Sequence, residues 1–162
     1  MKKLINPSNI LACVSFVFAL VMVILYAVNI NTNGYFQGVK AQYVVLMCIL
    51  TMVAACGIIG LNFLKFDGVA GKCVTIGNVA LKVAIPVFMF IAALMLVQSR
   101  IEGFGYIFFS NVDVAKEVAT PANISSAITS MVAIGFGAVA ALVGIVAAFF
   151  QPKKEEPEPQ QD

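Results

Sequence analysis

Residues 74–97 read VTIGNVALKVAIPVFMFIAALMLV, a run in which Lys82 is the one charged side chain. An α-helix rises 1.5 Å per residue, so about 20 residues are enough to cross a hydrocarbon core about 30 Å thick. A run of this length with so few charges is typical of a membrane-spanning helix. The stretch therefore decides the class of the fold.

Three more stretches have the same character, and none of the four contains Asp, Glu or His. Of the 162 residues, 61% are hydrophobic and 11% are charged, whereas soluble domains average about half apolar and a quarter charged residues. The alternating polarity of barrel strands is absent from these stretches. The sequence therefore predicts an all-α membrane protein, with four transmembrane helices in an antiparallel bundle within residues 1–150. The predicted helices cover about 8–30, 42–65, 74–98 and 122–150.

The cations outside these stretches predict an orientation. If the four helices cross in sequence, six lysines lie on the side of both termini and of the loop between helices two and three. Three cations lie on the other side. Short loops rich in Lys and Arg stay cytoplasmic, so both termini are predicted to be cytoplasmic. The six are Lys2, Lys3, Lys65, Lys72, Lys153 and Lys154, and the three are Lys40, Arg100 and Lys116.

Two segments lie outside the predicted helices at the end of the chain and before helix four. Residues 151–162, QPKKEEPEPQQD, cannot bury enough apolar area to fold and are predicted to be a disordered cytoplasmic tail.

Residues 99–121 form the longest predicted outside loop. In this loop Ser110-Asn111-Val112-Asp113 resembles a capping box with Asp in place of Glu, which predicts a short helix over 112–119. Thr120 and Pro121 then suit the cap and first residue of helix four. The loop is either a docking platform or a packed connector.

Aromatic residues gather around the other outside loop, between helices one and two. Tyr26, Tyr35, Phe36 and Tyr43 lie close together in the sequence. Aromatic belts of this kind anchor helices at the membrane interface, so belt anchoring is the prediction, and stacking on a ligand is the alternative.

Lys82 is the polar residue that points most directly to chemistry. A charge within a membrane span is costly and marks a functional site by default. A lysine near the cytoplasmic end of a helix can also extend its stem to the headgroups. Asn78 lies one helical turn away and could accept a hydrogen bond from the Lys82 ammonium. Lys82 and Asn78 therefore form a possible intramembrane polar site, which either lines a path or sits at the headgroups.

Helix four carries the pattern of closely packed membrane helices. Small residues four apart allow two helix backbones to approach each other. The pairs are Gly137 with Ala141, Ala140 with Gly144, and Gly144 with Ala148. They predict tight packing, either within the chain or against a second membrane protein.

Several chemistries are not supported by the composition. The chain has no His, and its four cysteines all lie in or beside predicted helices, so neither a metal-binding set nor a disulfide framework is predicted. No nucleophile and base pair is available either. We expect no enzymatic activity and no cofactor. The net charge of +2 does not suggest nucleic acid as a partner.

In outline the chain resembles the many small four-span proteins of bacterial membranes, and the Met-Lys-Lys start and short loops favour a bacterial cytoplasmic membrane. Two functions remain. The first is a non-catalytic accessory, scaffold or assembly subunit that associates with another membrane protein through helix four and the 99–121 loop. The second is a homo-oligomeric channel or carrier for an ion or small solute, with Lys82 lining the path.

Overall fold

The computed structural model describes residues 7–63 and 68–150. The predicted tail, 151–162, lies outside the described residues, as do all but Lys72 of the six lysines that predict the orientation of the termini. Within the described ranges the chain forms five helices. They are α1 (Pro7–Asn31), α2 (Val44–Phe63), α3 (Gly68–Phe108), α4 (Val112–Val118) and α5 (Pro121–Phe149).

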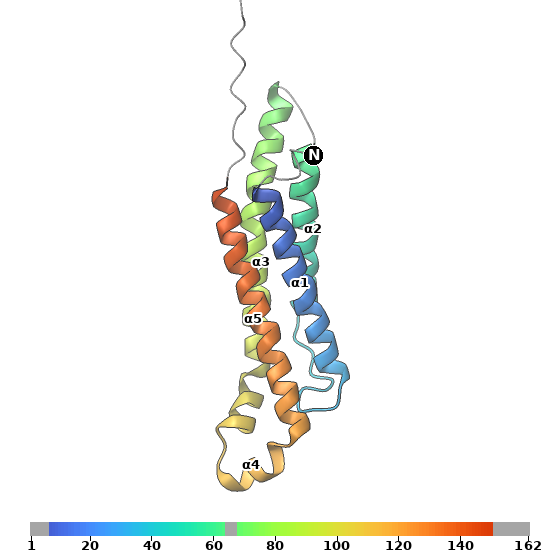
Figure 1. The fold of residues 1–162 in the computed structure, drawn as a ribbon, viewed down its shortest axis with the longest axis vertical. Helices are drawn as coiled ribbons and strands as arrows, with labels where there is room; N and C mark the ends of the chain where they lie inside the picture. The colour runs from blue at the N-terminus through green and yellow to red at the C-terminus, as the bar shows by residue number, and fades with distance from the viewer. Residues whose placement is uncertain (1–6, 64–67, 151–162) are drawn as a thin grey trace, which may run out of the picture.

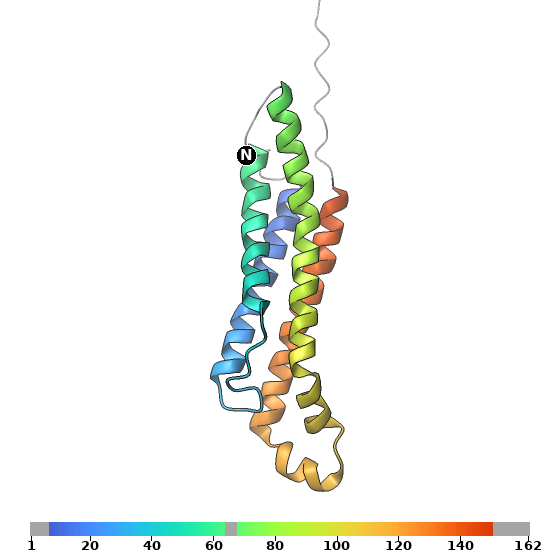
Figure 2. The same ribbon diagram turned by 180° about the vertical axis from the view of Figure 1, so that it is seen from behind.

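The four long helices form an antiparallel bundle (Figures 1 and 2). Each of α1, α2, α3 and α5 is long and apolar enough to cross a membrane. Contacts join α1 to α2, α2 to α3, α3 to α5 and α5 to α1, so the helices close into a ring. The start of α1 and the end of α5 lie at one end of the bundle, the terminal end, and α4 lies at the other, the α4 end (Figure 1). The predicted all-helical four-span bundle is confirmed.

Buried residues recur along the long helices at spacings of four and three, which alternate throughout α1 and α5. This is the a/d pattern of coiled coils and four-helix bundles, in which helices cross at about 20°. We call this inward-facing set the seam. In α1 the seam consists of Ser8, Ala12, Ser15, Ala19, Met22, Tyr26 and Asn29, and in α5 of Ser126, Ser130, Ala133, Gly137, Ala140, Gly144 and Ala147.

The seam is made mostly of small residues because lipid offers no hydrophobic drive for helix association. Helices in a membrane instead gain from close packing and from interhelical hydrogen bonds. A Cβ on Gly137 would lie 2.8 Å from the Met22 sulfur, and a Cβ on Gly144 would lie 2.9 Å from Ile85 Cγ2 and 3.0 Å from Pro86 Cδ. The backbone of α5 therefore passes directly over α3 at Pro86.

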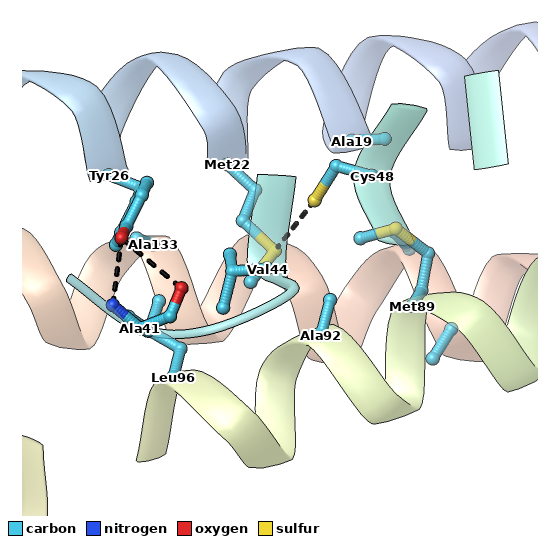
Figure 3. Packing of buried hydrophobic residues seen from close by; sticks show 12 residues of the cluster. Ala19, Met22, Tyr26, Ala41, Val44, Cys48, Met89, Ala92, Leu96 and Ala133 are labelled. Atoms are coloured by element: carbon cyan, nitrogen blue, oxygen red, sulfur yellow. Dashed lines mark hydrogen bonds between the residues drawn. The ribbon is translucent and has the colours of Figure 1, made fainter. Parts of the chain in front are cut away.

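Sulfur-containing side chains of the seam meet in the main hydrophobic cluster of the bundle (Figure 3). Met22, Cys48 and Met89 are fully buried there, and Cys48 Sγ lies 3.8 Å from Met22 Sδ. Flexible, polarisable thioethers fill irregular gaps well. They complete the packing where the small residues of α1 and α5 leave room.

Helix α3 extends beyond its predicted limits at both ends. The predicted range was 74–98, but α3 covers Gly68–Phe108, 41 residues, or about 60 Å at 1.5 Å per residue. Charged and glycine residues at the two ends of α3 predict loops. A helix can nevertheless include such residues where it extends beyond the hydrocarbon core. Residues 99–108, predicted as loop, therefore belong to α3.

The short helix predicted in the 99–121 segment is present as α4, but its cap is shifted by one residue. The side chain of Asn111 accepts a hydrogen bond from Val114 N at 3.0 Å, whereas Ser110 donates to Tyr106 O at 2.7 Å. The predicted capping box beginning at Ser110 is therefore wrong. The predicted start of α5 is confirmed, because Thr120 caps that helix and Pro121 is its first residue.

A methyl group on Gly144 should destabilise the bundle. Gly144→Ala would push its Cβ against Ile85 and Pro86, and we expect the free energy of unfolding to fall by about 1–3 kcal/mol. The matched control is Gly135→Ala on the same helix, where a Cβ would meet nothing within 4 Å. The control should gain about 0.5–1 kcal/mol from the better helix propensity of alanine. Denaturant titration in detergent micelles measures both, and equal effects would contradict the packing described here.

Candidate functional site

Two cations of α3 are buried in the bundle. Lys82 is 3% exposed and Arg100 is 0% exposed. They are eighteen residues apart, or about 27 Å along a helix, which is close to the thickness of the hydrocarbon core. Each cation therefore lies near one edge of the span. Because ionisable residues buried at this depth point to function by default, the two cations define the candidate sites.

Lys82 binds the end of α5. Its ammonium donates to the carbonyl oxygen of Phe150, the C-cap residue of α5, at 2.9 Å. Carbonyl groups at a helix C-terminus lack intrahelical partners and carry the negative end of the helix dipole. The predicted pairing of Lys82 with Asn78 is not observed. Lys82 instead stabilises the last turn of α5 at the terminal end.

Asn78 takes part in a separate chain of side-chain hydrogen bonds. Its Nδ2 donates to Asn62 Oδ1, and Asn62 Nδ2 donates to Asn9 Oδ1. The chain therefore links α3 to α2 and α2 to α1. Such interhelical bonds satisfy polar groups that lipid cannot, so the three asparagines fix the relative positions of three helices at the terminal end.

Arg100 lies at the α4 end, beneath the segment that joins α1 to α2. Its Nη2 donates to the carbonyl oxygen of Val39 at 2.9 Å. Its Cζ lies 4.6 Å from the centroid of the Phe36 ring and 5.9 Å from that of Tyr26. Both distances fall in the range of cation–π attraction. We call Arg100, Tyr26, Phe36 and Val39 the Arg100 site.

The charge of Arg100 is only partly balanced by these contacts. Its Nε and Nη1 are buried and have no hydrogen-bond partner. No carboxylate within residues 7–63 and 68–150 forms an ion pair with Arg100. Leaving charged donors buried and unpaired costs more than the bonds that are made. The site is therefore short of an acceptor.

Glycines allow the covering segment to lie flat on the bundle. Phe36 is 1% exposed and packs edge-on against Tyr35 and Phe104. A Cβ on Gly103 would lie 2.5 Å from the Phe36 ring. Where the same segment meets α5, a Cβ on Gly34 would lie 2.5 Å from Ser126 Cβ. The segment can approach both α3 and α5 because these side chains are absent.

Hydrogen bonds hold the same segment and α1 in place. Asn29 Nδ2 donates to Ser126 O at 2.6 Å, and Ser130 Oγ donates to Asn29 Oδ1 at 2.9 Å, so α1 is clamped to α5. Ala41 N donates to the Tyr26 hydroxyl at 2.8 Å. The Arg100 site is therefore held by residues from α1, α3, α5 and the segment before α2.

The sequence prediction for the aromatic residues was partly wrong. Tyr43 is 56% exposed and Tyr35 is also exposed, as a belt requires, but Tyr26 and Phe36 are buried over the guanidinium of Arg100. The sequence predicts Arg100 in an outside loop, whereas the structure places it on α3 and buries it. A lone arginine directly after a span, facing a loop rich in aromatic residues, was the signal that could have indicated the site.

The small residues of the last helix are used inside the chain. Gly137, Ala140, Ala141 and Gly144 are buried, whereas Ala148 is partly exposed and Ala147 takes the next buried position. Gly137 faces Met22 of α1 and Ala93 of α3. This face of α5 is therefore occupied by the bundle itself.

Comparison of the chain with protein-family models, curated proteins and solved structures gives no match.

Adding a methyl group at Gly103 should loosen the cover of the Arg100 site. Gly103→Ala would place a Cβ within 2.7 Å of both the Phe36 and Tyr35 rings, so we expect Phe36 to leave its position and the segment around Lys40 to become mobile. Trypsin cleavage after Lys40 should then be roughly tenfold faster, which corresponds to about 1.4 kcal/mol of destabilisation.

The matched control for this experiment is Gly105→Ala, two residues along α3, where a Cβ would meet nothing within 4 Å. Its cleavage rate should equal that of the wild type. Equal rates for Gly103→Ala and the wild type would show that Phe36 does not cover the site in the way described.

Proposed function

We propose that this polytopic membrane protein is a non-catalytic accessory or assembly subunit that associates with another membrane protein. The observation that carries the proposal is a hollow at the α4 end, between the last turns of α3 and the start of α4. The hollow has a volume of about 510 Å³, and its wall includes Tyr106, Phe109 and Val114. Glu102 and Asn111 also line it.

The aromatic side chains at this hollow are strongly exposed. Phe109 is 84% exposed and Tyr106 is 54% exposed. Phe109 lies nine residues beyond Arg100, or about 13 Å further from the hydrocarbon if the spacing is that of a helix. Exposed aromatic surface beyond the lipid tails is typical of protein interaction sites. The hollow therefore suits an apolar side chain inserted by a partner protein.

The small-residue face of the last span, α5, which the sequence suggested as the association surface, is covered by the rest of the bundle. The small-residue face of α5 packs against α1 and α3, so it does not offer a free surface to a partner. The surface that supports association is the end of α3 together with α4. The exposed charges around it are mainly acidic, since Glu102, Asp113 and Glu117 outnumber Lys116, which favours a partner surface with basic residues.

The alternative, a homo-oligomeric carrier with Lys82 on the path, has less support. The Lys82 ammonium is held by the Phe150 carbonyl. The neighbouring seam residues, Ile85 and Met89, are 1% and 0% exposed. A lysine bound to its own helix end and followed by a filled seam favours a stabilising role over a transport role.

Photo-crosslinking from the hollow tests the proposal. A photoreactive amino acid at Tyr106, in full-length protein in its native membrane, should give an adduct with a different membrane protein. The matched control is Leu142, which is 62% exposed on α5 and should give lipid adducts alone. Adducts of Tyr106 with lipid alone would contradict the proposal, and adducts with a second copy of this chain would favour the homo-oligomeric carrier.

We further propose that the terminal end faces the cytoplasm, in a bacterial cytoplasmic membrane. The sequence supports this orientation, because six lysines fall on the side of the termini against three cations on the other side, and positive residues in short loops remain inside. In a protein with Cys73 as the one remaining cysteine, an impermeant thiol reagent added outside intact cells should leave the thiol unlabelled. With cysteine placed instead at Asn33 or Lys116, both exposed at the α4 end, labelling should be complete. The reverse pattern would invert the orientation.

A further inference from the structure

Arg100 carries a positive charge that the described part of the chain leaves without a counter-charge. Its one hydrogen bond goes to the Val39 carbonyl, and its remaining contacts are the faces of Phe36 and Tyr26. The buried Nε and Nη1 donors have no acceptor. A guanidinium presents its N–H groups in a planar fork that matches the oxygens of a phosphate or carboxylate. An oxyanion is therefore the group that would complete the site.

A polar groove lies beside the segment whose Val39 carbonyl binds Arg100, although Arg100 itself does not line the groove. It has a volume of about 330 Å³, and its lining includes Lys40, Gln42, Gln98 and Ser99. This volume is at the lower end of the range for small-ligand pockets, about 300–1,000 Å³. Ser99 precedes Arg100 on α3, and Lys40 follows Val39, the residue that accepts the Arg100 hydrogen bond. The groove thus brings a second cation and several polar side chains next to the wall behind which Arg100 is buried.

The backbone of residues 39–41 forms that wall, and four hydrogen bonds hold it. The Val39 carbonyl accepts from Arg100 and Val39 N donates to Phe36 O at 3.1 Å, while the Tyr26 hydroxyl accepts from Ala41 N at 2.8 Å and donates to Ala41 O at 3.4 Å. The preceding residue, Gly38, is in the left-handed region with φ of 72° and has open space around it. A small displacement of this wall would expose the guanidinium to the groove, where an oxyanion could take the place of the Val39 carbonyl.

The depth of the groove matches that of lipid phosphates. Arg100 lies near one edge of the hydrocarbon core, because about 27 Å separates it from Lys82 along α3. The headgroup layer begins just beyond this edge. A basic pocket between membrane helices at this depth can bind an anionic headgroup, as such pockets do on the cytoplasmic side of other membrane proteins.

We propose that Arg100 and Lys40 form a binding site for a phosphate group, which is either the headgroup of an anionic phospholipid or free phosphate. Lys40 draws the anion into the groove, and Arg100 pairs with its oxygens through the donors that are now unsatisfied. Gln42, Gln98 and Ser99 supply neutral hydrogen-bonding groups around it. The site does not depend on a protein partner.

Thermal unfolding of the purified full-length protein, in nonionic detergent and followed by circular dichroism, tests the site. The three probes are phosphatidylglycerol, phosphatidylcholine and inorganic phosphate. Phosphatidylglycerol should raise Tm saturably, by about 5 °C at a concentration on the order of 100 times Kd. Phosphatidylcholine, whose headgroup has no net charge, should shift Tm less.

Two variants and one matched control identify the residues. Lys40→Gln, at an exposed position, should leave the fold intact and raise the phosphatidylglycerol concentration needed for half of the shift about tenfold, which is the loss of one charge-assisted contact. Arg100→Gln should abolish the saturable shift. Lys116→Gln removes an exposed cation of α4 at the same end of the bundle and should leave the shift unchanged. If Arg100→Gln does not fold, Lys40→Gln against Lys116→Gln decides the result.

The outcomes separate the two sources of phosphate. A shift with phosphatidylglycerol but not with inorganic phosphate assigns the site to a lipid headgroup. A shift with inorganic phosphate that Lys40→Gln weakens assigns it to a free anion. The proposal is overturned if neither probe shifts Tm, or if Lys40→Gln and Lys116→Gln respond alike.

Discussion

The close approach of helix backbones across the small-residue seam is the contact on which the rest of the structure depends. In lipid, apolar surface gains little by moving from acyl chains to a neighbouring helix. Stability must come from van der Waals contact, which is lost rapidly when two surfaces separate. Gly137 and Gly144 let α5 lie directly against α1 and α3. Pro86 lies at the second of these approaches, where its ring packs against α5 at Gly144 rather than ending α3.

The seam also explains where the polar residues lie. Polar side chains in the long helices either turn toward the other helices, as Asn29 and Asn78 do, or bond to a carbonyl of their own helix, as exposed Thr75 does with Gly71 O. The clearest sets lie at the two ends: the ladder of Asn9, Asn62 and Asn78 at the terminal end, and the clamp of Asn29 with Ser126 and Ser130 at the α4 end. The middle of the bundle is left to small and sulfur-containing side chains. Polar bonds thus fix the ends of the helices, while packing fixes the middle.

The two buried cations differ in how far the bundle satisfies their hydrogen-bond donors. Lys82 is satisfied by the end of its own bundle, and it has a structural role that needs no ligand. Arg100 is not satisfied, although three aromatic or carbonyl groups surround it. The α4 end therefore carries both features that point outside the chain, the unsatisfied guanidinium and the aromatic hollow beside α4. Under the association proposed above, one feature would bind lipid and the other protein, and the residues of α3 that line the groove (Met95, Gln98 and Ser99) and the hollow (Glu102, Gly105 and Tyr106) follow one another along one face of the helix.

The sequence by itself determined the number of spans, the helical class, the cap of α5 and the presence of α4. These features depend on local properties: the length of apolar runs, and cap residues that bond to a backbone only a few positions away. The ends of α3 could not be predicted from the sequence, because charged residues such as Arg100 and Glu102 end a membrane span but need not end a helix. Only the tertiary structure decided that Lys82 bonds to Phe150, 68 residues away, and that Phe36 and Tyr26 enclose Arg100. Those partners come from distant parts of the chain, and their meeting depends on how the seam aligns the bundle, which no local pattern in the sequence specifies.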